Sequence, residues 1–237
     1  MRIRLLLTTM VFLVFSTEAV ELILDYTTPA GQWNEALPLG NGRIGAMVFG
    51  GPGIEQIQLN EDTLWAGGPN YALEPRMREI IPERRRILGG DPIGAHKYFQ
   101  DRHVRTSKNG NSFAYQTLGS LLLKFDGHDF PVDYRRSLSL EDAIARSSYR
   151  IDDVVYRREA FVALADDVMV VRLTASKPGA ISFTAFWQSP HQRDAKAVND
   201  GVGLTLSGRA SRQFDVDGAV RYFVRLLPQL KGGRLAC

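Results

Sequence analysis

The glycines at residues 40–45 have a spacing that could bind a nucleotide. The segment GNGRIG reads G-x-G-x-x-G, and Glu61 follows about where a ribose-binding acid would be expected. A dinucleotide turn needs a strand before the first glycine and a helix after the last one. Pro38 leaves little room for that strand, and GGPG at residues 50–53 cannot form the helix. We therefore interpret the glycines as a tight turn at Asn41-Gly42 that leads into a strand.

Adjacent acidic residues are a second arrangement that could do chemistry, because two facing carboxylates can act as general acid and general base. Four such pairs occur, at residues 61–62, 141–142, 152–153 and 166–167. Neighbouring residues on a strand point to opposite faces, and the last two pairs fall at predicted turns. We therefore assign no catalytic residue. Glu61, with Trp65 close by in the sequence, remains a candidate for contact with a ligand.

Aromatic residues near these motifs could stack on a sugar ring, since their faces pack well against apolar C–H groups. The set comprises Trp33, Trp65, Tyr71 and Tyr115. The alternative, which we favour for the two tryptophans, places them in the core or at a domain interface.

Polar residues at the glycine turn and next to Glu61 each have two interpretations. Asn41 and Arg43 could reach a substrate from the turn, or they could satisfy buried backbone groups. Asn60 could contact a ligand or act as a turn or capping residue. The residues that we predict to contact a substrate or a neighbouring domain are Trp33, Asn41, Arg43, Asn60, Glu61, Trp65 and Tyr115.

We expect no metal and no cofactor. Cys237 is the only cysteine, so an internal disulfide or a cysteine-based metal site is excluded. His96 and His103 could share one face of a predicted helix. Metal sites usually have tighter spacing and a carboxylate partner, so a surface pair is the better interpretation.

The elements that must position these residues are mostly strands. Runs rich in Val, Ile, Leu, Phe and Tyr recur about every ten residues between turn residues, with no helical pattern after residue 140. This predicts a mostly β fold, a large antiparallel β-sandwich. Strands are expected at residues 43–49, 56–59, 121–125, 134–140, 143–151, 154–162, 168–175, 181–187, 202–207 and 220–226. A short helical insertion is expected near residues 73–103, with Pro82 dividing its first helix and Asp91-Pro92 starting its second.

Residues 1–19 have the features of a secretory signal peptide. Arg2 and Arg4 precede an apolar run at residues 5–15, and small residues lead to a cut after Ala19. The run is shorter than the ~20 residues that cross a bilayer, although an uncleaved anchor is the alternative. We expect a secreted or periplasmic protein with no membrane span in the mature chain. The net charge of +3, evenly spread, argues against nucleic acid as a partner.

Two motifs carry a resemblance to a known family. The segment WNEALPLGNGRIGAMVFGG at residues 33–51 resembles the opening of glycoside hydrolase family 95, the α-L-fucosidase family, and so does EQIQLNEDTLWAGGP at residues 55–69. Residues 115–125 and 134–187 are similar to the same domain, in order and at suitable spacing. Ala66 and Thr117 depart from residues that are common in the family. The resemblance covers nearly the whole chain from residue 20 to residue 237.

The resemblance implies an N-terminal β-sandwich domain that is followed, in the family, by a helical linker, an (α/α)6 barrel and a smaller β domain. The family hydrolyses fucosylated glycans with inversion, and its catalytic groups lie in the barrel. We expect the barrel to be absent from this chain, the sandwich to be truncated at its C-terminus, and the chain alone to be inactive. The alternatives are a stand-alone carbohydrate-binding β-sandwich module and the poorly folding product of a decayed gene.

Overall fold

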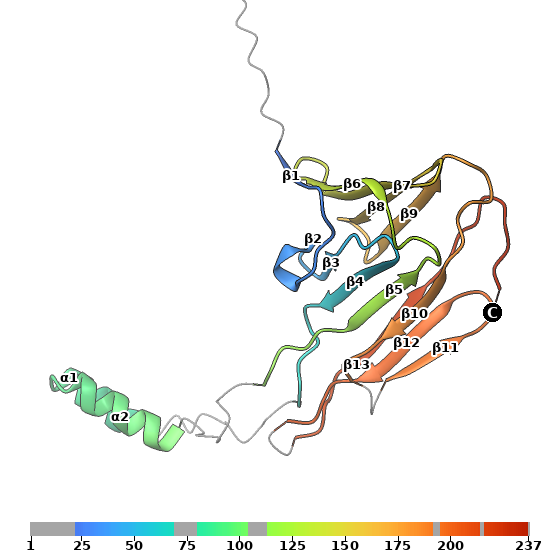
Figure 1. Ribbon diagram of the computed structural model, residues 1–237. Helices are drawn as coiled ribbons and strands as arrows, with labels where there is room; N and C mark the ends of the chain where they lie inside the picture. Colours follow the sequence, from blue (N-terminus) through green and yellow to red (C-terminus); the bar gives the residue numbers. More distant parts are fainter. Residues whose placement is uncertain (1–21, 69–79, 104–112, 192–194, 214–215, 237) are drawn as a thin grey trace, which may run out of the picture.

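The structure is a computed structural model that describes residues 22–68, 80–103, 113–191, 195–213 and 216–236. Its body consists of two five-stranded sheets and a three-stranded sheet, and neighbouring strands pair in the antiparallel sense. The predicted mostly β, antiparallel sandwich is therefore confirmed (Figure 1). Of the helices in the described part of the chain, none is long and apolar enough to cross a membrane.

The first sheet has the order β1-β6-β7-β8-β9, and the second has the order β10-β5-β4-β3-β2. The strands of the first sheet are β1 (Ile23–Tyr26), β6 (Val132–Ser139), β7 (Ile144–Ile151), β8 (Val154–Val162) and β9 (Met169–Ala175). Those of the second are β2 (Leu37–Gly40), β3 (Ile44–Val48), β4 (Ile54–Glu61), β5 (Gly119–Lys124) and β10 (Thr184–Gln188). The third sheet contains β11 (Lys196–Asn199), β12 (Leu204–Arg209) and β13 (Arg221–Leu226), and β12 contacts β10.

Alternation of side chains along the strands builds the core between the first two sheets. In β4, Ile57 and Leu59 are buried while the residues between them are half-buried. In β8, Ala160 and Val162 are buried in the same way. These side chains belong to one apolar cluster that also reaches Leu206 and Tyr222 of the third sheet. Burying a side chain such as Ile57 contributes about 1.5–3 kcal/mol, so this cluster supplies the main stabilisation of the sandwich.

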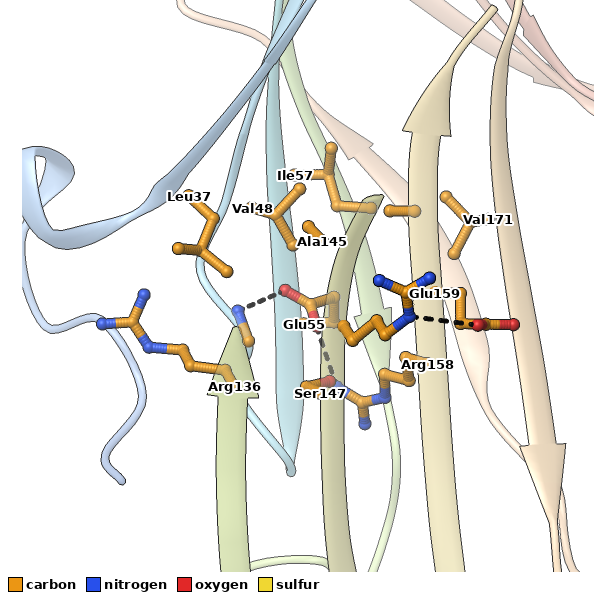
Figure 2. Close-up of a pocket in the computed structure, with 13 residues that line it drawn as sticks. Leu37, Val48, Glu55, Ile57, Arg136, Ala145, Ser147, Arg158, Glu159 and Val171 are labelled. Atoms are coloured by element: carbon orange, nitrogen blue, oxygen red, sulfur yellow. Dashed lines mark hydrogen bonds and ion pairs between the residues drawn. The ribbon is translucent and has the colours of Figure 1, made fainter. Parts of the chain in front are cut away.

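A buried ion pair crosses the same core. Arg158 of β8 donates to the Oε2 atom of Glu55 of β4 over 3.0 Å, and both residues are buried. The other carboxylate oxygen, Oε1, accepts from the backbone N–H of Gly50 over 2.7 Å. Figure 2 shows Glu55 and Arg158 beside a cavity of only about 10 Å³, with Leu37 and Val48 on one side. The two sheets therefore share a polar contact as well as an apolar core.

Most of the expected strands are confirmed, with three additions. The sequence did not predict β1, β2 or β11. Each has only four residues, and Pro38 in β2 argued against a strand. Proline is accommodated there because β2 lies at the edge of its sheet, where one side of the strand needs no ladder hydrogen bonds.

The helical insertion is also confirmed in part. Helices α1 (Ile81–Leu88) and α2 (Pro92–His103) pack against each other, and α2 starts at the proline that was expected to begin it. Pro82 lies in the first turn of α1, where a missing N–H costs nothing, and its predicted division of a longer helix stays a prediction. The first part of the predicted helix, residues 73–79, lies outside the described residues.

Candidate functional site

The G-x-G-x-x-G segment forms a β-hairpin turn between β2 and β3. Gly40 pairs with Gly45 across the hairpin, and Gly42 has φ +94°, a conformation that L side chains rarely adopt. The Oδ1 atom of Asn41 accepts from the backbone N–H groups of Arg43 (3.0 Å) and Ile44 (2.8 Å), which closes the turn. A strand does precede Gly40, contrary to our prediction. The chain after the turn continues as an antiparallel strand instead of a helix, so the phosphate-binding helix end of a dinucleotide site does not form.

Asn41 and Arg43 connect this turn to the loop between β8 and β9 through hydrogen bonds. The Nδ2 atom of Asn41 donates to the carbonyl of Ala163 over 3.0 Å. Arg43 donates through NH1 to Asp167 over 2.9 Å and through Nε to Glu61 over 3.2 Å. Hydrogen bonding to Glu61 and the charge of Asp167 raise the pKa of Arg43, so the guanidinium is firmly charged. The turn is therefore hydrogen-bonded to both sheets at one end of the sandwich.

Glu61 is an ionised hydrogen-bond acceptor. Its Oε2 atom accepts from the backbone N–H of Thr63 over 3.0 Å and from the Thr63 hydroxyl over 2.6 Å. Burial pushes the pKa of Glu61 upward, but the hydrogen bonds from Thr63 and Arg43 outweigh that effect and hold the pKa below its ordinary value. A carboxylate held in this way is poorly suited to donate a proton, and well suited to accept hydrogen bonds from hydroxyl groups.

Trp65 and Tyr115 form an exposed aromatic pair next to Glu61. Their rings meet edge to face, with centroids 5.4 Å apart and an interplanar angle of 65°. The Nε1 atom of Trp65 donates to the carbonyl of Asp62 over 3.1 Å, and the Tyr115 hydroxyl donates to the carbonyl of Glu61 over 3.2 Å. Trp65 is 46% exposed and Tyr115 is 44% exposed. The pair is thus fixed by its backbone contacts and still offers ring surface to solvent.

Trp33 lies at the outer side of β4. It is 56% exposed and Trp65 is 46% exposed, so neither lies in the core, and the alternative of a domain interface stays a prediction. The Nε1 atom of Trp33 donates to the Gln58 side chain over 2.7 Å. Asn60 follows two positions later, on the same face as Gln58, and its buried Oδ1 atom has no hydrogen-bond partner among the described residues. Tyr71, the remaining aromatic candidate, lies outside the described residues.

The structure therefore brings five of the seven predicted residues together. We call Asn41, Arg43, Glu61, Trp65 and Tyr115 the hairpin cluster. Of the other two predicted residues, Trp33 contacts β4 through Gln58, and Asn60 precedes Glu61 in β4. Asp167 and Thr63 are partners that the sequence reasoning missed: Asp167 had been read only as a turn residue, and its contact with Arg43 spans 124 positions. Within the described part of the chain, no three His, Cys, Asp or Glu side chains are grouped as metal ligands would be.

Comparison with known proteins shows the family of this chain. Residues 24–236 match the family described as glycosyl hydrolase family 65, N-terminal domain. The chain belongs to this family. The match spans all three sheets, so the glycosyl hydrolase N-terminal domain is the whole described body and not a part of it.

Individual relatives narrow the resemblance to α-fucosidases. Alpha-L-fucosidase 2 of Arabidopsis thaliana is 35% identical over 172 residues, which cover 71% of this chain and 20% of that protein. Probable alpha-fucosidase A of Aspergillus oryzae is 31% identical over 161 residues, which cover 64% of this chain and 21% of that protein. The chain thus spans about a fifth of the length of these curated relatives. The family 95-like N-terminal domain expected from the sequence is confirmed.

Proposed function

We propose that this glycosyl hydrolase N-terminal domain belongs to a secreted α-L-fucosidase-like enzyme that hydrolyses fucosylated glycans with inversion. The observation that carries the proposal is the 35% identity with Alpha-L-fucosidase 2 over 172 residues. The aligned part amounts to 20% of that relative, which leaves most of its length for a catalytic domain. In this proposal the chain supplies the sandwich, and the reacting groups come from a barrel outside residues 1–237.

The chemistry of inversion explains why we place the reacting groups outside this chain. An inverting glycosidase needs a carboxylic acid that protonates the leaving group and a carboxylate that activates water, about 6.5–9.5 Å apart. Glu61 lies next to the exposed aromatic pair, and its hydrogen bonds stabilise the ionised form. We assign it a binding role: it accepts hydrogen bonds from sugar hydroxyls or from the neighbouring domain, while Trp65 offers a ring face for stacking.

An activity assay tests directly whether the catalytic groups lie outside this chain. The purified chain should give no turnover of 4-nitrophenyl α-L-fucoside above the rate without enzyme. A chimera in which this domain replaces the matching segment of the Arabidopsis relative should release fucose, and NMR should show the inverted anomer first. Trp65→Ala in the chimera should weaken binding more than turnover. Hydrolysis by the isolated chain that co-purifies with it would overturn the proposal.

Secretion is a separate part of the proposal. It is supported by the charged start and apolar run within residues 1–19, a segment outside the described residues. Expression of the full chain in a bacterial host, followed by mass spectrometry of the exported product, should show an N-terminus at Val20. A product that keeps residues 1–19 and stays with the membrane would support an uncleaved anchor instead.

A second candidate function is carbohydrate binding by the domain itself. The exposed Trp65–Tyr115 pair favours it, because a fixed aromatic edge beside an ionised carboxylate resembles a sugar-binding surface in its chemistry. Calorimetric titration of the chain with fucosyllactose tests it, with Trp65→Ala as the variant and Trp33→Ala as the matched control. Binding that only the first variant loses would favour this function, and no binding at millimolar sugar would exclude it.

A further inference from the structure

A hollow of about 560 Å³ lies on the outer face of the first sheet, on the side opposite to the core. Its volume falls in the range of about 300–1,000 Å³ that is typical of small-molecule sites. It is separate from the hairpin cluster, whose residues do not line it. The sheet register arranges its side chains in two adjacent rows that cross the strands.

The first row contains guanidinium and hydroxyl groups only. Arg135 pairs with Ser148 on β7, Ser148 with Arg157 on β8, and Arg157 with Thr174 on β9. Neighbouring strands lie about 4.8 Å apart, so these side chains form one continuous line. Arg135 already binds Asp25 through two hydrogen bonds of 2.6 and 2.9 Å. Asp25 of β1 therefore neutralises Arg135, and the other arginine of the row is Arg157.

Arg157 stands in the middle of this row with its charge uncompensated. The side chain is exposed, and within the described residues it has neither an ion pair nor a hydrogen bond. Its guanidinium can donate five N–H groups in a planar fork, a geometry that fits carboxylate and sulfate oxygens in a bidentate manner. The hydroxyls of Ser148 and Thr174 flank it on both sides. The Thr174 Oγ1 atom donates to the backbone carbonyl of Arg157 over 3.5 Å, so it can accept a hydrogen bond from a ligand but has no further proton to donate.

The second row carries both charges. It contains Ser137, Arg146, Glu159 and Arg172, which are paired in this order from β6 to β9. Glu159 lies between the two arginines, 3.5 Å from each. Its carboxylate is shared over these long contacts and can still accept hydrogen bonds from hydroxyl groups.

From these two rows we infer that the hollow binds an anionic oligosaccharide, with a carboxylate or sulfate group on Arg157 and sugar hydroxyls on the second row. The mixture of groups argues for a saccharide over a nucleic acid. The Glu159 carboxylate can accept hydrogen bonds from sugar hydroxyls, and a DNA phosphodiester backbone offers no such donors. No aromatic side chain lines the hollow in the described part of the chain, so stacked bases would find no platform. This site is independent of the function proposed for the hairpin cluster.

Isothermal titration calorimetry of the full chain tests this inference with four probes at low salt. These are a trigalacturonate, a sulfated galactan trisaccharide, neutral maltotriose and a short oligothymidylate. We expect binding of at least one anionic saccharide, which weakens as salt is added, and no binding of maltotriose. The trigalacturonate and sulfated arms show which anionic group the site prefers.

Three variants locate the binding. Arg157→Gln should lose about tenfold or more in affinity, because a hydrogen-bonded charge is removed, while Arg157→Lys should lose less. Arg221→Gln removes an exposed strand arginine from the third sheet and should bind as the wild type does. Circular dichroism should show unchanged folding, since each side chain is exposed. The inference is overturned if no saccharide binds at millimolar concentration, if maltotriose binds equally well, if Arg157→Gln and Arg221→Gln lose equally, or if oligothymidylate binds more tightly through Arg157.

Discussion

Glu55 and Arg158 form an ion pair of 3.0 Å between the two five-stranded sheets, with both side chains almost completely removed from solvent. Arg158 also donates to the carbonyls of Gly51 (2.6 Å) and Pro52 (2.7 Å), and to the hydroxyl of Tyr149 (2.6 Å). Burial raises the pKa of Glu55, and the charge of Arg158 opposes this effect. The pair is costly to bury, but both terminal nitrogens of the guanidinium donate hydrogen bonds, so its two members depend on each other.

Replacing Arg158 with Met should destabilise the domain strongly. The change leaves the Glu55 carboxylate buried without its partner, a situation that costs about 3–5 kcal/mol. Urea unfolding followed by circular dichroism measures the loss. Arg157→Met is the matched control, because Arg157 precedes Arg158 on the same strand and points to the exposed face. It should change the free energy of unfolding by less than about 0.5 kcal/mol. Equal losses in the two variants would contradict the role given to the pair.

Acid should destabilise the domain through His128. Arg158 donates to the Tyr149 hydroxyl, so that hydroxyl can donate its proton to the Nδ1 atom of His128 over 2.8 Å. Burial and the charge of Arg158 lower the pKa of His128 from its ordinary 6.5. Below that pH the unfolded chain takes up a proton that folded His128 does not, so the free energy of unfolding should fall as the pH decreases.

The measurement is a series of urea titrations from pH 8 to pH 5. His128→Gln should reduce the slope of stability against pH in this range. His96→Gln should leave the slope unchanged, because His96 is an exposed helix residue that contacts Gln100. A slope that survives His128→Gln would show that other groups cause the acid sensitivity.

Asn41 should stabilise the domain through two separable contacts. Its Oδ1 atom closes the β2–β3 turn, and its Nδ2 atom reaches the carbonyl of Ala163. Asn41→Ala removes both and should cost about 1–2 kcal/mol. Asn41→Asp keeps the turn acceptor but places a carboxylate oxygen against the Ala163 carbonyl, so it should lose the Nδ2 contact and add a repulsion between two oxygens. Thermal unfolding of the wild type and the two variants makes the comparison, and wild-type stability of Asn41→Asp would contradict the role given to the Nδ2 atom.

Replacing Gly67 with alanine should destabilise the domain more than replacing Gly42 with alanine. Both have positive φ, 64° and 94° respectively. A Cβ atom at Gly67 would lie 2.4 Å from the Phe113 ring, whereas at Gly42 no atom lies within 4 Å. Gly42→Ala should therefore cost only the backbone strain of about 1 kcal/mol, and Gly67→Ala clearly more. Chemical denaturation of both variants tests this, and equal losses would show that the Phe113 contact is easily relieved.

Much of the fold could be predicted because its signals are local. The alternation in VVYRREAFV predicts β8, and the turn residues Asp152-Asp153 mark the end of β7 and the start of β8. Neither signal depends on contacts with distant residues. The elements that escaped prediction are β1, β2 and β11, all four residues long. A strand of that length shows too few alternations to be recognised, and it forms because a neighbouring strand offers it hydrogen bonds.

The residues of the candidate site could be predicted from the sequence, but the contacts between their side chains could not. The sequence placed Asn41, Arg43 and Glu61 in two short motifs, and the register of β3 with β4 brings them together. It could not show that Arg43 also binds Asp167, because that contact depends on how the two sheets pack. Nor could it place Trp33 and Trp65 at the surface, since a tryptophan in a strand-rich sequence suits a core equally well.

The sequence by itself determined the family, the strand-rich fold and the identity of the residues at the β2–β3 hairpin, because these depend on residue types and short spacings. Only the tertiary structure decided that Glu55 would pair with Arg158 inside the core, and that the side chain of Arg157, one position earlier, would face a polar hollow with no ion-pair partner among the described residues. The physical reason is the pleat of a strand. Adjacent side chains point to opposite faces, and the packing of one sheet on another decides which face becomes buried.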